Sequence, residues 1–213
     1  MVGGLLNHNE FGVAEKDVWV SSFIKQYKES HPVENFKFAL SDNIIHNQDL
    51  PAVEEIYDNN GDIVDFRVIG GEYIFREGDA YDTYAIDINR DDFSQIFDNI
   101  VSNARKYGFT DKNHQDYTIS IDIEKGSLVN GKETITMSIR NNGNPLAADL
   151  KPKDVFKWSI GNGEGIGGAQ VKDIVEHFGG SVELVQDMTR EDGFYVEYRL
   201  TFPISKSNIV LTL

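Results

Sequence analysis

The sequence predicts an α+β sandwich in which one mixed, mainly antiparallel sheet carries helices on a single face. Three observations favour this fold. Apolar residues recur at helical spacing in three segments, strand-like segments alternate apolar and polar residues, and Asn-Gly or Gly-Gly pairs lie between successive segments. The chain has 213 residues, of which 40% are hydrophobic, and this suffices for one domain with a sizeable core.

The first part of the chain predicts one helix and several short strands. A helix from about Asp17 to Ser30 ends at His31-Pro32 and is indicated by four apolar residues at helical spacing: Val20, Phe23, Ile24 and Tyr27. A short strand over 36–40 follows. Further on, Asn59 to Asp62 separates two β-compatible runs, 53–57 and 63–69, and so predicts a hairpin turn, with another strand over 73–75.

The second part predicts a strand over 84–88 and then the strongest helix, which Asn89 caps and Gly108 ends. Its apolar face consists of Phe93, Ile96, Phe97, Ile100, Val101 and Ala104. Two antiparallel strands are expected over 117–123 and 135–139. A loop rich in Asn, Gly and Pro then leads into a helix over about 171–178, and strands over 181–185 and 194–202 form a closing hairpin.

Composition excludes several classes of function. The formal net charge is −15, from 35 acidic and 20 basic residues, which argues against nucleic acid or an anionic membrane as partner. Cysteine is absent, so disulfides and thiolate metal sites are excluded. No apolar run approaches the roughly 20 residues that cross a bilayer. We expect a soluble cytoplasmic domain, or the cytoplasmic part of a membrane-anchored sensor, without membrane contact of its own.

A polar stripe follows the helix from Arg90 to Tyr107. Gln95, Asn99, Asn103 and Lys106 are four, four and three residues apart, so they share one face of an α-helix. An asparagine carbonyl oxygen is a hard ligand that suits Mg²⁺, and Lys106 can meet a phosphate charge. The spacing equally fits an ordinary amphipathic helix with a solvated face, so the helix alone leaves both interpretations open.

A turn-forming segment from Arg140 to Leu146 lies where a strand ends. Gly143 lets the backbone approach a flat ligand such as a purine, and the side-chain oxygen of Asn141 can accept a hydrogen bond from an exocyclic amine. Asn, Gly and Pro also make turns without any ligand, and this alternative stays open.

A glycine-rich segment from Gly161 to Gly168 opens the helix that follows. Its glycines leave backbone N–H groups bare, and these can hold phosphate oxygens together with the positive end of the helix. It is not a P-loop, because no Lys-Ser or Lys-Thr pair follows the last glycine. A flexible linker is the alternative interpretation.

Taken in this order, the three segments resemble the N-box, G1 box and G2 box of the GHKL superfamily, whose members share the Bergerat ATP-binding fold. Gln95 to Tyr107 looks like the N-box of sensor histidine kinases, in which two asparagines precede an alanine and a lysine-tyrosine pair. Asn141 to Pro145 is similar to the Asp-x-Gly-x-Gly of G1, and 163–167 matches G2. Phe156 lies where the family has its F-box, and 178–180 with 202–204 resembles the closing hairpin.

The resemblance implies a Bergerat-type fold that binds ATP and Mg²⁺. Asn99 and Asn103 would be the magnesium ligands, Asn99 and Lys106 the catalytic residues, and 146–162 the ATP lid, with Lys151, Lys153 and Lys157 as helpers near the phosphates. The nucleotide-binding residues would be Asn103, Tyr107, Asn141, Gly143, Phe156, Gly163, Gly165, Ile166 and Gly167. Tyr107 would pack by the adenine, and the side chain of Glu164 would point away from the phosphates.

The sequence also departs from the family pattern. Asn141 replaces the aspartate that reads adenine, although its amide oxygen can still accept a bond from the adenine amine. Pro145 replaces the second glycine of G1, and Gly168 stands where G2 usually has leucine. The stretch from about 41 to 83 is an insertion, for which a surface excursion is the simplest account. None of the five histidines lies in a dimerising helical hairpin, so a phosphoacceptor histidine must lie elsewhere.

We therefore expect a single ATP-binding domain over 12–205, with a C-terminal tail over 206–213. Its function would be that of the catalytic domain of a two-component sensor histidine kinase. Such a domain donates the γ-phosphate of Mg-ATP to a histidine on another domain and so acts indirectly on a response regulator. The alternative is a nucleotide-gated regulatory module, such as an anti-sigma-factor-like serine kinase or a regulator that binds ATP without turnover. A third alternative is an α+β domain that binds no nucleotide.

Overall fold

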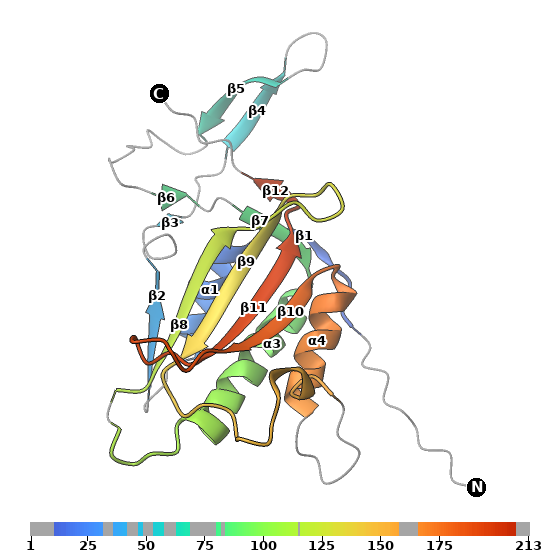
Figure 1. The fold of residues 1–213 in the computed structure, drawn as a ribbon. Helices are drawn as coiled ribbons and strands as arrows, with labels where there is room; N and C mark the ends of the chain where they lie inside the picture. The colour runs from blue at the N-terminus through green and yellow to red at the C-terminus, as the bar shows by residue number, and fades with distance from the viewer. Residues whose placement is uncertain are drawn as a thin grey trace, which may run out of the picture.

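The protein folds into two layers, a five-stranded sheet and a layer of helices on one face of it (Figure 1). The computed structural model describes residues 11–31, 36–41, 47–48, 53–57, 63–68, 80–81, 84–114, 116–157 and 166–207. The predicted fold class, an α/β sandwich with a mixed, mainly antiparallel sheet, is confirmed.

The main sheet has the strand order β10-β11-β9-β8-β2. Its strands are β2 (Lys37–Leu40), β8 (Thr118–Lys125), β9 (Thr134–Asn141), β10 (Ser181–Gln186) and β11 (Val196–Pro203). Only β2 and β8 pair in parallel within this sheet, and the other neighbours are antiparallel. The register follows the alternation of the sequence. Ile121 lies opposite Ile139 on the buried face, and Ser120 lies opposite Arg140 on the outer face.

Three helices cover the inner face: α1 (Val20–Ser30), α3 (Arg90–Asn103) and α4 (Ile166–His177). Asn89 caps α3 as predicted, because its Oδ1 accepts hydrogen bonds from the backbone N–H groups of Asp91 and Asp92. The apolar face of α3 is buried, and Phe93 stacks on Phe23 of α1 with ring centres 4.3 Å apart. No helix in the described ranges is long and apolar enough to cross a bilayer.

The last turn of the N-box helix is not α-helical. Ala104–Gly108 forms a π-helical turn, η1, directly after α3. A π turn spaces its hydrogen bonds one residue wider than an α turn and so rotates every side chain after it. The spacing argument that placed Lys106 on the same stripe as Asn99 and Asn103 assumed a regular α-helix, and this turn does not meet that assumption.

A second, smaller sheet lies beside the first and was not predicted. It consists of β1 (Glu15–Trp19), β7 (Tyr84–Ile88) and β12 (Lys206–Ser207), in the order β1-β7-β12. The first helix therefore starts at Val20, three residues later than predicted. Residues 15–19 pair with β7 instead, and the register shifts near Asp17, whose φ is 53°.

The stretch predicted as an insertion contains two small pairs of strands. β4 (Val53–Tyr57) and β5 (Ile63–Val68) form the predicted antiparallel hairpin, while β3 (Asn47–Gln48) pairs in parallel with β6 (Ala80–Tyr81). These strands lie beyond one end of the main sheet, and the C-terminal end of α3 lies at the other (Figure 1). The predicted turn over 59–62 and the predicted strand over 73–75 lie outside the described residues.

Candidate functional site

Both asparagines of the N-box helix are held through their amide nitrogens. Asn99 Nδ2 donates to Gln170 Oε1 on α4 at 3.3 Å, and Asn103 Nδ2 donates to the hydroxyl of Tyr198 on β11 at 3.3 Å. The two side chains lie on the flank of α3 that faces α4 and the sheet. Within the part of the chain that the structure describes, neither Oδ1 atom accepts a hydrogen bond. Two carbonyl oxygens are thus left for an external ligand.

Tyr198 is a buried residue with one polar contact to this flank. Its side chain is 4% exposed, and burial raises the pKa of the hydroxyl to about 12, although the hydrogen bond from Asn103 acts in the opposite direction. The hydroxyl is therefore protonated near neutral pH. The ring also packs edge-on against Phe156, with centres 6.2 Å apart. Tyr198 thus contacts both the N-box helix and the segment predicted as the lid.

The start of α4 packs closely against α3 and against this segment. A Cβ atom on Gly167 would lie 3.0 Å from Asn99 Oδ1, so the glycine brings the G2 backbone next to an N-box side chain. A Cβ on Gly168 would lie 2.1 Å from the carbonyl oxygen of Val155, a distance that no side chain tolerates. Glycine at 168, where the family pattern has leucine, therefore allows Val155 to sit directly on α4.

The described part of the lid is compact. A 3₁₀ turn, η2 (Pro152–Asp154), precedes Val155 and Phe156, which pack against the core. Lys157 pairs with Asp154 at 2.5 Å, and the hydrogen bond from Lys157 lowers the pKa of this carboxyl below its usual range. Lys151 and Lys153 are exposed. Of the three lysines predicted as helpers, Lys157 is already engaged within its own turn.

The G1 segment closes on the end of the N-box helix. Asn141 is buried at the end of β9, and its Oδ1 accepts a hydrogen bond from the N–H of Gly143 at 3.1 Å. Asn144 N–H donates to Gly108 O at 2.8 Å, and a Cβ on Gly143 would lie 2.6 Å from the Gly108 carbonyl. The oxygen that was expected to receive the adenine amine therefore already has a partner.

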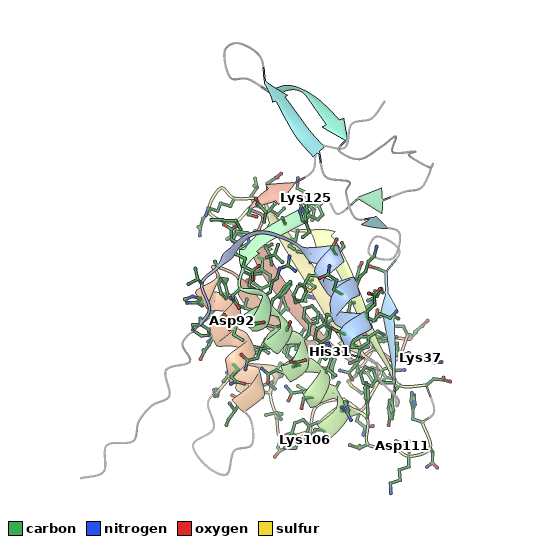
Figure 2. The ribbon with its side chains drawn as sticks, turned by 180° about the vertical axis from the view of Figure 1, so that it is seen from behind. His31, Lys37, Asp92, Lys106, Asp111 and Lys125 are labelled. Atoms are coloured by element: carbon green, nitrogen blue, oxygen red, sulfur yellow. The ribbon has the colours of Figure 1, made fainter. Side chains whose placement is uncertain are left out.

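Lys106 and Tyr107 lie apart from the two asparagines. Lys106 Nζ sits 4.9 Å from the centre of the Tyr107 ring, which is 52% exposed. With Asp98, Lys106 lines a hollow of about 660 Å³ that α1 bounds on its other side. Figure 2 views the molecule from its helical side and shows Lys106 at the far end of α3 from Lys125. The predicted contacts of Lys106 with phosphate and of Tyr107 with adenine stay predictions.

Several predicted residues fall outside the described part of the chain. These are Gly163, Gly165 and Glu164, together with the lid residues 158–162. Ile166 is described as the first residue of α4 and is 37% exposed. A separate cavity of about 880 Å³ lies at the opposite end of the sheet, between Asp87, Lys132, Phe178 and Ile204, and shares no residue with the N-box flank.

Two residues of this flank were missed by sequence reasoning. Gln170 lies four residues after Ile166 on α4, and Tyr198 alternates with other buried residues of β11 as one more core aromatic. A tyrosine on a buried strand face has a hydroxyl that needs a hydrogen-bond partner. The sequence alone could therefore have indicated that Tyr198 makes a polar contact. Gln170 had none, because its partner depends on how α4 packs on α3.

Comparison with known proteins is consistent with this geometry. The model of the family described as histidine kinase-, DNA gyrase B- and HSP90-like ATPase matches residues 88–206. No curated protein matches the sequence. Among solved structures, a mycobacterial sensor histidine kinase, MprB, aligns with a TM-score of 0.51 and 10% identity, covering 87% of this chain and 92% of that one.

Full-length ShkA in complex with AMPPNP aligns with a TM-score of 0.52 and 15% identity, covering 93% of this chain and 33% of ShkA. At these identities the likeness concerns the fold alone. The family match is independent of that likeness, spans more than half of the sequence and contains the N-box, G1 and described G2 residues. The chain therefore belongs to the family of histidine kinase-, DNA gyrase B- and HSP90-like ATPases.

Proposed function

We propose that this chain is the catalytic domain of a sensor histidine kinase, which binds Mg²⁺-ATP and presents its γ-phosphate to a histidine on a separate domain. The observation that carries the proposal is the pair of open Oδ1 atoms of Asn99 and Asn103, next to the start of α4. The phosphoacceptor domain would be the direct partner, and a response regulator the indirect one.

The donor set fits a magnesium ion. Mg²⁺ prefers oxygen ligands, and the contacts to Gln170 and Tyr198 occupy the two amide nitrogens while leaving the oxygens open. Asn99 and Asn103 would therefore be the protein ligands of the ion. When bound there, Mg²⁺ neutralises charge on the phosphate oxygens, which is the main requirement of phosphoryl transfer.

The remaining residues of the chain would position the triphosphate. The N-terminal end of α4 would direct the backbone N–H groups of its first turn and a positive dipole end toward phosphate oxygens. Gly167 keeps this end free of a side chain beside Asn99, and the Val155 contact at Gly168 holds the base of the lid. Positioning and charge neutralisation account for most of what a protein contributes to this reaction.

Calorimetric titration with a non-hydrolysable ATP analogue, with and without Mg²⁺, tests the proposal. In Asn103→Ala we expect the Mg²⁺-dependent gain in affinity to fall by about tenfold or more, because one ligand oxygen is lost. Ser102→Ala is the matched control, since Ser102 is the exposed neighbour on α3 and lines the hollow towards α1. An unchanged magnesium dependence in Asn103→Ala would remove Asn103 from the metal site, and the lack of any nucleotide binding by the wild type would favour a domain that binds no nucleotide.

A second function keeps the same site but does not transfer phosphate to a histidine. It is a nucleotide-gated regulatory module, such as an anti-sigma-factor-like serine kinase or a regulator that binds ATP without transferring phosphate. The tight contact between Gly168 and Val155 favours it, because a lid whose base is packed on α4 has less freedom to open. Phosphorylation of a histidine-bearing helical hairpin by this chain with radiolabelled ATP would support the kinase, whereas Mg²⁺-dependent binding without transfer would support the regulator.

A further inference from the structure

The two asparagines of α3 are held by different parts of the fold. Asn103 donates to the hydroxyl of Tyr198 on β11, which is 4% exposed and belongs to the hydrophobic core. Asn99 donates to Gln170 on α4, and both of these side chains are half-buried. One amide is therefore positioned by the sheet, and the other by the helix that follows the glycine-rich G2 segment.

The amide of Asn99 lies along the first turns of α4. A Cβ atom on Gly167 would come within 3.0 Å of Asn99 Oδ1, whereas Asn99 Nδ2 lies 3.3 Å from Gln170 Oε1. Gly167 and Gln170 are three residues apart and so share one face of the helix. The first turn of a helix presents backbone N–H groups and a positive dipole end, which favour an oxygen beside Gly167 over a second donor.

Gln170 can hold this orientation because its side-chain oxygen is an acceptor. An apolar side chain in its place would leave Asn99 Nδ2 without that partner, and the amide could then turn toward water. Neither helix formation nor packing calls for glutamine here, since leucine has a similar helix propensity and would bury more apolar surface between α3 and α4. The acceptor atom is thus the property of Gln170 that an ordinary packing residue would lack.

We propose that Gln170 is a positioning residue for Mg²⁺, which holds Asn99 Nδ2 and thereby keeps Asn99 Oδ1 available to the ion. This inference rests on the proposed Mg²⁺-ATP site and concerns a residue that acts through Asn99 alone. Asn103 does not depend on it, because Tyr198 holds that side chain from β11. Replacing a residue that orients a metal ligand typically lowers metal affinity by about 10- to 100-fold.

Gln170→Leu tests this proposal, with Gln26→Leu as the matched control at an exposed position of α1. In calorimetric titration with a non-hydrolysable ATP analogue, we expect the Mg²⁺-dependent gain in affinity to fall about tenfold in Gln170→Leu and to stay unchanged in Gln26→Leu. Gln170→Glu keeps an acceptor of the same length and should retain the gain. A glutamine needed only for packing would give the opposite order, with Gln170→Leu keeping the magnesium dependence, and that result overturns the inference.

A second measurement needs neither nucleotide nor metal. In nuclear magnetic resonance spectra of the nucleotide-free protein, the side-chain amide signals of Asn99 should shift in Gln170→Leu and stay in place in Gln26→Leu. Unchanged Asn99 signals in Gln170→Leu would refute the contact itself. Loss of magnesium dependence in Asn103→Ala but not in Gln170→Leu would sink the inference alone, whereas a wild type without any Mg²⁺-dependent nucleotide binding would sink the proposed function with it.

Discussion

Glu197 and Tyr198, two neighbouring residues of β11, show that polar groups are paired differently on the two faces of the sheet. Glu197 lies on the outer face, is 4% exposed, and accepts hydrogen bonds from Arg190 at 2.5 Å and from Arg199 at 2.9 and 3.2 Å. Burial alone would raise the pKa of this carboxyl, but the hydrogen bonds from Arg199 and Ser138 and the two guanidinium charges outweigh it and lower the pKa.

Tyr198, the next residue, lies on the helix-covered face. Its hydrogen-bond partner, Asn103, keeps one amide atom without a hydrogen bond among the described residues. Tyr198 holds Asn103 by the amide nitrogen, and the oxygen of the same amide stays open. A buried charge is costly unless it is fully paired, whereas a neutral amide can keep one atom for a ligand. The Glu197 carboxylate is therefore paired within its own cluster, whereas the open amide oxygens indicate where a ligand can bind.

The largest loss of stability is expected on the helix-covered face, for Gly168→Ala. The new Cβ would meet the Val155 carbonyl, which is backbone and cannot rotate away, so we expect a loss of about 2–3 kcal/mol in the free energy of unfolding. Urea denaturation measures it. Gly167→Ala is the control, because the heavy atoms nearest to its Cβ would belong to the movable side chain of Asn99, and it should cost less stability. Equal stability of the two variants would show that Val155 is not tightly packed on α4.

A smaller effect is expected for Glu197→Gln on the outer face. Hydrogen bonds to charged groups contribute more than neutral ones, and because both arginines are partly solvated we expect a loss of about 1–2 kcal/mol at neutral pH. The folded pKa lies below 4.5, the ordinary value for a glutamate side chain, so the unfolded chain takes up the proton first as pH falls. The stabilisation is complete above about pH 4.5 and disappears as the pH drops through the folded pKa.

Urea denaturation at several pH values checks this prediction. The wild type and Glu197→Gln should differ at pH 7 and converge in acid, while Glu183→Gln, at an exposed position of β10, should match the wild type throughout. A difference between wild type and Glu197→Gln that persists unchanged in strong acid would contradict the assignment.

The smallest change in stability is expected for Tyr198→Phe, which removes one hydroxyl from the covered face. We expect a cost of about 1 kcal/mol, and the same for Tyr27→Phe, whose hydroxyl donates to Asp98 on the other flank of α3 at 2.7 Å. Only Tyr198→Phe should also weaken the Mg²⁺ dependence of nucleotide binding, because only it frees Asn103. Calorimetry with and without Mg²⁺ separates the two variants, and equal Mg²⁺ dependence in both would show that Tyr198 does not orient Asn103.

The features that sequence predicted well are those set by local pattern. The alternation of Ile119, Ile121 and Ile123, the cap at Asn89 and the hairpin over 53–68 all follow from residues near in sequence. The start of α1 was wrong because pairing with β7, about 70 residues away, outweighed helical spacing. The π turn at 104–108 has no comparable pattern in the sequence, so the position of Lys106 could not be foreseen.

The candidate site shows the same division. The position of Asn99 and Asn103 on one face of a helix follows from their four-residue spacing. The position of Gly167 next to Asn99 was expected from the order of the motifs. The contacts to Gln170 and Tyr198 and the direction of the Asn141 amide depend on packing between segments far apart in the chain. These contacts decide which atom of each side chain is left for a ligand. Composition and spacing therefore predict which residues form the site better than they predict how those residues are hydrogen-bonded.

The small sheet around β7 joins the chain segments that lead into two of the helices. β7 is flanked by β1 on one side and β12 on the other, and it runs through Asn89 straight into α3. β1 in turn continues directly into α1, so the pairing of β1 with β7 fixes the start of α1 beside the start of the helix that carries both asparagines.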